Sequence, residues 1–119
     1  MVSLYNQRCA FCGLRIISAD GQDIVDGGHI KPFSEFRDDR LVNGLALCKN
    51  HHWAFDHVWF GVDDDYRILM PEERFIEDPA VQSREIKAFG GEKIRLPKDQ
   101  KFMPSIDSLE WHRKKWRIA

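Results

Sequence analysis

Two short pairs of candidate metal ligands stand far apart in this chain of 119 residues. Cys9 and Cys12 form the first pair, and Cys48 and His51 repeat the same spacing after 35 intervening residues. Zinc in structural sites takes four sulfur or nitrogen ligands in a tetrahedron, often supplied as two such pairs. All three cysteines of the chain are used in this way, so we predict a structural Zn²⁺ site made by these four residues.

The same residues allow three other interpretations. In the first, Cys48 is a buried core cysteine and the Cys9–Cys12 spacing is incidental. The matching Cys-x-x-His pair makes this coincidence rarer by chance. In the second, Cys9 and Cys12 form a redox pair, but such a pair usually opens a helix after a strand, and this one does not. In the third, the zinc site belongs to a finger that reads nucleic acid, which uses the same ligand types.

A second set of polar residues, His29, Asn43 and His52, is interleaved with the zinc ligands. Each has an ordinary explanation alone, such as the turn that Asn before Gly favours, but the ordered set is much rarer by chance. Neighbouring helical side chains point about 100° apart, so His51 and His52 can serve two different sites. Asp56 follows His52 by four residues on the same helix face, where it either orients His52 or is a solvated side chain.

The order of these motifs resembles that of the HNH (ββα-metal) endonuclease superfamily. The resemblance is carried by His-Ile-x-Pro from residue 29, Asn-Gly-Leu from residue 43, and Cys-x-x-His-His followed by Phe-Asp from residue 48. The chain is particularly similar to HNH domains at the C-terminus of bacterial restriction enzymes that recognise modified DNA. The motif covers residues 9 to about 60, and the tail, with Leu96-Pro97 and then residues 109–113, resembles the closing segment of those domains more weakly.

This resemblance implies an α+β fold, in which a ββα-metal core sits on a Cys3His zinc knuckle and is followed by a small hairpin and a C-terminal helix. It also implies a metal-dependent DNA endonuclease that leaves 5′-phosphate and 3′-hydroxyl ends. His29 would be the general base, because imidazole titrates near ~6.5. Asn43 would hold the hairpin loop and so fix His29. His52 would help bind a catalytic Mg²⁺, Mn²⁺ or Ni²⁺ that neutralises the scissile phosphate and the leaving oxygen.

The chain departs from the family pattern immediately before the general base. Many HNH enzymes have a metal-binding Asp or His there, and this chain has Gly28. Asp26 is the nearest acid and is the candidate ligand. In a regular strand its spacing from His29 sends the two side chains to opposite faces, unless Gly27 and Gly28 form a bulge. The fourth zinc ligand, His51, also replaces the more common Cys.

The remaining sequence predicts how these residues are positioned. Length and a 43% hydrophobic composition fit one domain, 1–119, with a motif core over about 5–60 and an extension over 61–119. We expect strand pieces at 24–25 and 29–30, a turn and strand over 41–47, and a helix from 47 to 60 ended by Gly61. A hairpin over 62–69, a short helix near 82–88, a strand near 93–96 and a helix over 105–116 follow. Ser105 can cap the last helix, whose Leu109, His112 and Trp116 recur at helical spacing.

Charge bears on the partners. The 18 basic and 19 acidic residues give a formal net charge of -1, without the basic excess of an autonomous nucleic-acid binder. The candidate phosphate contacts around the predicted site are Lys31, Arg37, Arg40 and Lys49. We therefore expect DNA, modified or unmodified, as substrate, together with a specificity domain or partner protein. A double-strand break would need a second copy of the chain, because one site cuts one strand per visit.

The alternative function is a zinc-stabilised module that binds DNA or protein without cutting, which Gly28 and the near-zero charge favour. No apolar run is long enough to cross a membrane, and the first residues lack the pattern of a secretory signal. Three cysteines that act as metal ligands rather than in disulfide bonds also fit a reducing compartment. We expect a cytoplasmic protein without a membrane partner, and the resemblance implies a role in restriction or phage defence.

Overall fold

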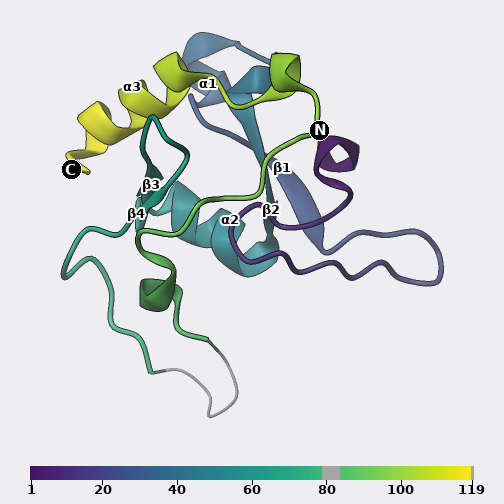
Figure 1. Ribbon diagram of the computed structural model, residues 1–119, viewed down its shortest axis with the longest axis horizontal. Helices are drawn as coiled ribbons and strands as arrows, with labels where there is room; N and C mark the ends of the chain where they lie inside the picture. The colour runs from purple at the N-terminus through teal and green to yellow at the C-terminus, as the bar shows by residue number, and fades with distance from the viewer. Residues whose placement is uncertain (79–83, 119) are drawn as a thin grey trace.

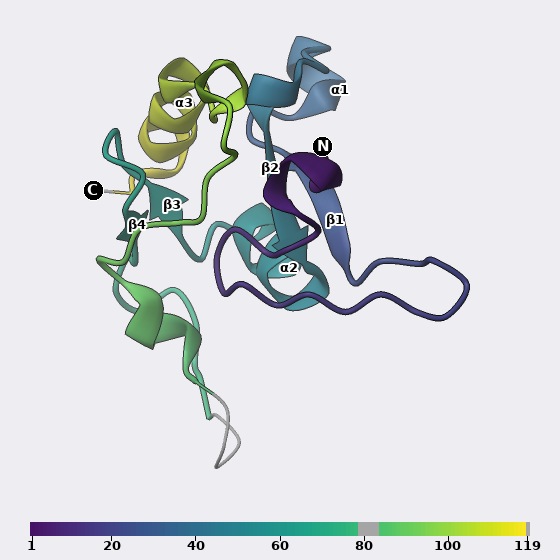
Figure 2. The ribbon, with the colours of Figure 1, turned by 45° about the vertical axis from the view of Figure 1, so that its right-hand side comes forward.

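The computed structural model describes residues 1–78 and 84–118. Strands β1 (Val25–His29) and β2 (Gly44–Cys48) form an antiparallel pair, and helix α2 (Lys49–Asp56) follows β2 directly. Figures 1 and 2 show α2 lying against the two strands. The predicted α+β fold with a ββα core is therefore confirmed.

The register of this hairpin is regular, from Val25 opposite Cys48 to His29 opposite Gly44. The two glycines before His29 therefore form no bulge, and one continuous strand replaces the two expected pieces. Side chains alternate along such a strand, so Asp26 and Gly28 share one face of β1 while His29 belongs to the other. Strand β2 is buried along its whole length, which packs the hairpin into the core.

A tight turn holds the first pair of candidate zinc ligands, Cys9 and Cys12, against β2. The backbone N–H of Gly13 donates to the carbonyl of Cys9 at 2.8 Å, and the N–H of Ala10 donates to the carbonyl of Ala46 at 2.7 Å. Gly13 has a φ of +82°, a conformation that glycine adopts at little cost. The knuckle turns at Gly13, and the hydrogen bond from Ala10 to β2 brings the two pairs of candidate ligands together.

Helix α2 is shorter than predicted. It ends at Asp56 rather than at Phe60, and Val58 has a φ of 63°, outside the helical region. Phe60 is almost fully buried and packs on Phe11 and Phe55, with ring centroids 4.5 Å and 5.3 Å away. The chain leaves the helix early because Phe60 must turn back into the core.

Between the strands of the hairpin lie helix α1 (Phe33–Phe36) and a 3-10 turn at Leu41–Asn43. Other 3-10 turns occupy Val2–Tyr5, Ile86–Phe89 and Gln100–Phe102. The turn at 86–89 coincides with part of the helix expected near 82–88, of which residues 82 and 83 lie outside the described residues. The strand expected near 93–96 is wrong: of its residues, Lys93 alone forms an isolated bridge, to Arg67.

The C-terminal extension contains the predicted hairpin and helix. Strands β3 (Gly61–Val62) and β4 (Ile68–Leu69) pair antiparallel, and α3 spans Ile106–Trp116. The Ser105 side chain caps α3 by accepting from the N–H of Ser108. Leu109 is fully buried in the same cluster as Phe11 and Leu45, so extension and motif core share one hydrophobic cluster. Trp116, however, is 42% exposed and does not continue the buried stripe.

Across the part of the chain that the structure describes, no helix combines the length and apolarity needed to cross a membrane.

Candidate active site and zinc site

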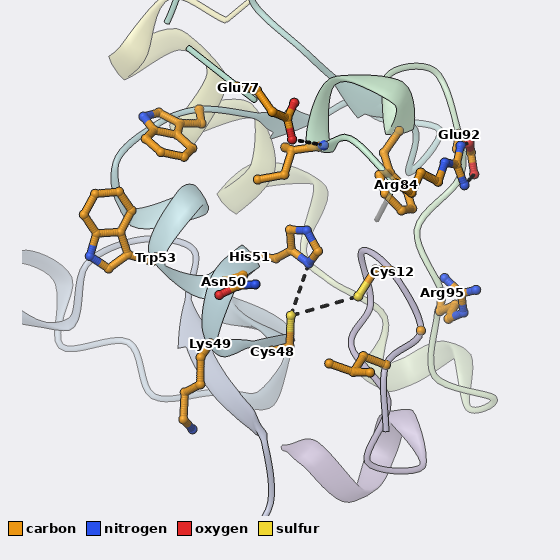
Figure 3. A pocket seen from close by; sticks show the side chains of 15 residues that line it. Cys12, Cys48, Lys49, Asn50, His51, Trp53, Glu77, Arg84, Glu92 and Arg95 are labelled. Atoms are coloured by element: carbon orange, nitrogen blue, oxygen red, sulfur yellow. Dashed lines mark hydrogen bonds and ion pairs between the residues drawn. The ribbon is translucent and has the colours of Figure 1, made fainter. Parts of the chain in front are cut away.

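The four predicted zinc ligands converge in space. The donor atoms of Cys9, Cys12, Cys48 and His51 all lie within 4.8 Å of one another. Nδ1 of His51 is 3.2 Å from Sγ of Cys48 and 3.8 Å from Sγ of Cys9. Sγ of Cys12 lies 4.0 Å from Sγ of Cys48 (Figure 3). Zinc–sulfur bonds of about 2.3 Å in a tetrahedron require sulfur–sulfur edges of about 3.8 Å, so donor types and spacing fit a zinc ion.

The surroundings of this cluster fix it in place. The ring of His51 stacks on that of Phe11, with centroids 4.2 Å apart. Hydrogen bonds from the sulfurs of Cys12 and Cys48 lower the pKa of the Cys9 thiol. All three cysteines are free thiols. Within residues 1–78 and 84–118, no other group of three or more His, Cys, Asp or Glu side chains brings its donor atoms so close together.

His29 and His52 line a pocket that none of the four candidate zinc ligands lines. Both line a pocket of about 320 Å³, together with Asp56 from α2. His29 stands at the end of β1, and His52 lies on α2, which packs against that strand. His51, one residue earlier, faces the sulfur atoms instead (Figure 3). The adjacent histidines therefore point to two sites, as the helical geometry predicts.

Asn43 pins the loop that follows His29. It is fully buried, and its Oδ1 accepts from the backbone N–H of Lys31 at 2.9 Å. Its Nδ2 donates to the carbonyls of Lys31 at 3.1 Å and Asp38 at 2.9 Å. One amide side chain thus ties together both ends of the segment 31–38, in which the ring of Phe33 lies 5.4 Å from that of His29.

Replacing Asn43 by alanine is expected to lower the free energy of unfolding by about 2–4 kcal/mol, because three hydrogen bonds are lost and buried backbone groups are left unpaired. Urea unfolding of the zinc-loaded protein measures the change. Asn50→Ala provides the matched control, since Asn50 is exposed on α2 and should change stability by less than about 0.5 kcal/mol. Equal small losses in both variants would refute the bracing role of Asn43.

The imidazole of His52 lies between two carboxylates. Its Nδ1 is 3.4 Å from Oδ2 of Asp26, and its Nε2 is 3.4 Å from Oδ2 of Asp56. A hydrogen bond from Lys49, with a smaller contribution from His52, holds the pKa of Asp26 below its usual range. A Cβ on Gly28 would stand 3.0 Å from Nε2 of His52. A side chain at this position would require the ring of His52 to move by a few tenths of an ångström.

His29 has a partner that the sequence did not indicate. Its Nε2 lies 3.0 Å from Oδ1 of Asp39, a largely exposed carboxylate in the loop before β2. Asp39 belongs to the charged run Arg37–Arg40, and no local pattern singles it out. The side chains of Phe33, Trp111 and His112 also line the pocket and were absent from the predicted site.

Two of the four candidate phosphate contacts form ion pairs, and the other two lie over aromatic rings. Arg40 pairs with Asp38 through two hydrogen bonds, and Lys49 pairs with Asp26. Lys31 lies over the ring of Phe36 and Arg37 over that of Phe33. Lys31 and Arg37 thus lie against the aromatic rings of α1, without a salt-bridge partner among the described residues.

Comparisons with known proteins agree with this geometry. A family model for the HNH endonuclease matches residues 9–63. The solved structure named "Modification dependent TagI restriction endonuclease" superposes with a TM-score of 0.67 and 21% sequence identity, covering 96% of this chain. The chain spans only 35% of the length of that protein. No curated protein matches the chain.

The resemblance to the HNH superfamily is therefore confirmed, and residues 9–63 carry its motif unit. The likeness in fold extends over almost the whole chain, including the hairpin β3–β4 and helix α3. The family match supports a nuclease function for the unit at residues 9–63, and the structural likeness shows the fold.

Proposed function

We propose that the chain is a metal-dependent DNA endonuclease that hydrolyses phosphodiester bonds with His29 as general base. The observation that carries the proposal is the shared pocket: His29, His52 and Asp56 line it together, while the zinc ligands converge elsewhere. The order of these residues along the chain and the family match support the same assignment.

In this proposal Asp39 and Asn43 position the base. With Nε2 of His29 donating to Asp39, Nδ1 keeps its lone pair and can take a proton from the attacking water. Asn43 holds the segment 31–38 against the ring, which limits the motion of the base. Asp39 is thus the hydrogen-bond partner that orients the general-base histidine.

We propose that Nε2 of His52 and the carboxylate of Asp56 hold the catalytic divalent cation. One nitrogen and one carboxylate, completed by water, form a donor set suited to Mg²⁺, Mn²⁺ or Ni²⁺. Asp26 lies at the other ring nitrogen of His52, so it orients the ring. These roles exchange those expected from the sequence, where Asp26 was the candidate ligand. A cation bound here supplies neutralisation of charge at the scissile phosphate and leaving oxygen.

Metal stoichiometry tests this assignment and separates it from the alternative, a zinc-stabilised module that binds without cutting. Zinc-loaded protein titrated with Mn²⁺, with free ion followed by electron paramagnetic resonance, should retain one zinc and show one weaker Mn²⁺ site. Asp56→Asn should weaken Mn²⁺ binding at least ~10-fold. Asp65→Asn, in the exposed turn between β3 and β4, should leave it unchanged. Retained zinc with no Mn²⁺ site would favour the binding module.

We further propose DNA as the substrate, approached through Lys31 and Arg37 beside α1. The structural neighbour is named a modification-dependent restriction enzyme, and this supports modified DNA as the substrate and restriction or phage defence as the role. Because the net charge of -1 gives little general attraction to DNA, we propose a specificity domain or partner protein, and a second copy of the chain for double-strand breaks.

The compartment and the domain organisation complete the proposal. Free thiols at three zinc ligands suit a reducing environment, so we place the protein in the cytoplasm. We propose that residues 1–119 form one domain, because a single hydrophobic cluster contains residues of both the motif core and the extension, from Tyr5 to Leu109.

A further inference from the structure

The C-terminal helix α3 supplies one wall of the pocket that contains His29 and His52. Trp111, His112 and Trp116 line this wall. All three lie beyond residue 63, where the family match ends, so no motif assigns them a role. Both ribbon views place α3 at the same end of the molecule as α1, which follows His29 (Figures 1 and 2).

His112 is a buried polar side chain without a partner. It is 3% exposed, and its Nδ1 is sealed from solvent with no hydrogen-bond partner among the described residues. Its Nε2 makes no hydrogen bond to a described residue either, but it is not sealed in this way. An unpaired polar group costs folding free energy, so packing alone would be better served by an apolar ring.

The ring of His112 is held in a defined orientation and is uncharged. It stacks on Phe55, the residue before Asp56, with centroids 4.2 Å apart and planes 11° apart. Burial, assisted by the positive charge of Arg113, lowers the pKa of His112 to about 4. A neutral imidazole has one N–H donor, and with Nδ1 sealed the proton is better placed on Nε2, the nitrogen that is not sealed.

We infer that His112 is a further substrate-contacting residue, whose Nε2–H donates to a non-bridging oxygen of the phosphodiester in the pocket. The inference rests on the proposed nuclease function. A fixed donor aimed at a phosphoryl oxygen stabilises charge that develops in the transition state. Being neutral, it neither repels the cation nor competes with His29 for the proton of water.

Two variants of His112 test the contact. His112→Phe keeps a planar ring that can stack on Phe55 but removes both nitrogens, whereas His112→Gln restores an N–H donor. With Mn²⁺, kcat for bis(4-nitrophenyl) phosphate and for plasmid nicking should fall about 10- to 100-fold in the Phe variant, with little change in KM. The Gln variant should recover part of the loss. The matched control His57→Phe, at an exposed histidine outside the pocket, should keep the wild-type kcat. A folded, zinc-loaded His112→Phe with wild-type kcat would overturn the inference.

A second measurement does not depend on cleavage. The imidazole ¹⁵N resonances of the wild-type protein are recorded with Ca²⁺ before and after addition of the dinucleotide thymidylyl-thymidine. The Nε2 resonance of His112 should shift, and an unshifted resonance under saturating dinucleotide would overturn the inference. A shift in a protein that cuts nothing would support the contact while refuting the nuclease. Cleavage by a protein whose His112 resonance does not move would refute the contact alone.

Discussion

Replacing Cys48 by alanine should abolish both zinc binding and the folded state. Cys48 is the last residue of β2, the N-cap of α2 and a predicted zinc ligand, so three elements of the structure depend on its position. Structural zinc contributes an apparent binding free energy of about 10–16 kcal/mol, whereas a domain of this size is stable by only about 5–15 kcal/mol. Far-ultraviolet circular dichroism and zinc content by atomic absorption measure the two losses.

Two further samples make this result specific. Wild-type protein treated with a strong zinc chelator should lose its structure in the same way as Cys48→Ala. Ser108→Ala also changes a small buried side chain but lies far from the cluster in sequence and has no hydrogen-bond partner for its Oγ among the described residues. It should keep one zinc and the folded spectrum. A Cys48→Ala protein that still holds zinc would show that Cys48 is merely a core residue.

Replacing His29 by alanine should lower kcat for DNA nicking by about 10³-fold while leaving stability nearly unchanged. A positioned general base contributes about 10²- to 10⁴-fold to such reactions. The side chain of His29 is 37% exposed, so its removal leaves no core cavity and should change the free energy of unfolding by less than about 0.5 kcal/mol. Initial rates at saturating Mg²⁺ give kcat, and urea unfolding gives stability.

Asp39→Asn separates the roles of base and orienting partner. Asparagine can still accept from Nε2 of His29 but carries no charge, so we expect a loss of about 10-fold. A His29→Ala variant that cuts as fast as the wild-type protein would exclude His29 as the base, whatever the effect of Asp39→Asn.

The convergence of Cys9, Cys12, Cys48 and His51 and the ββα core could be predicted because ligand chemistry and spacing are local properties of the sequence. Cys-x-x-Cys and Cys-x-x-His each supply one half of a tetrahedral site. Bringing the two pairs together constrains the path of the chain that connects them. The adjacency of His51 and His52 likewise predicts two sites, since helical geometry sets their directions. The spacing of Asp26 and His29 also predicts that, without a bulge, their side chains lie on opposite faces of β1, and the regular pairing of the strands shows that there is no bulge.

Other features depend on contacts between distant segments. Asp39 meets His29 through a loop whose course no pattern in the sequence specifies. The roles of Asp26 and Asp56 depend on which nitrogen of His52 each carboxylate faces, and this follows from the packing of α2 on β1. Helical spacing places His112 on the same stripe of α3 as Leu109, but its place in the pocket depends on how α3 packs against the rest of the domain.

Strand scission by the zinc-loaded wild-type chain tests the central claim most directly. Supercoiled plasmid is incubated with the protein and Mg²⁺, Mn²⁺ or Ni²⁺, and with a chelator of free divalent ions as reference, and the nicked ends are analysed chemically. The account predicts nicking that requires the added metal and leaves 5′-phosphate and 3′-hydroxyl ends. Folded, zinc-loaded protein that nicks neither modified nor unmodified plasmid with any of these metals would contradict it and favour the zinc-stabilised binding module.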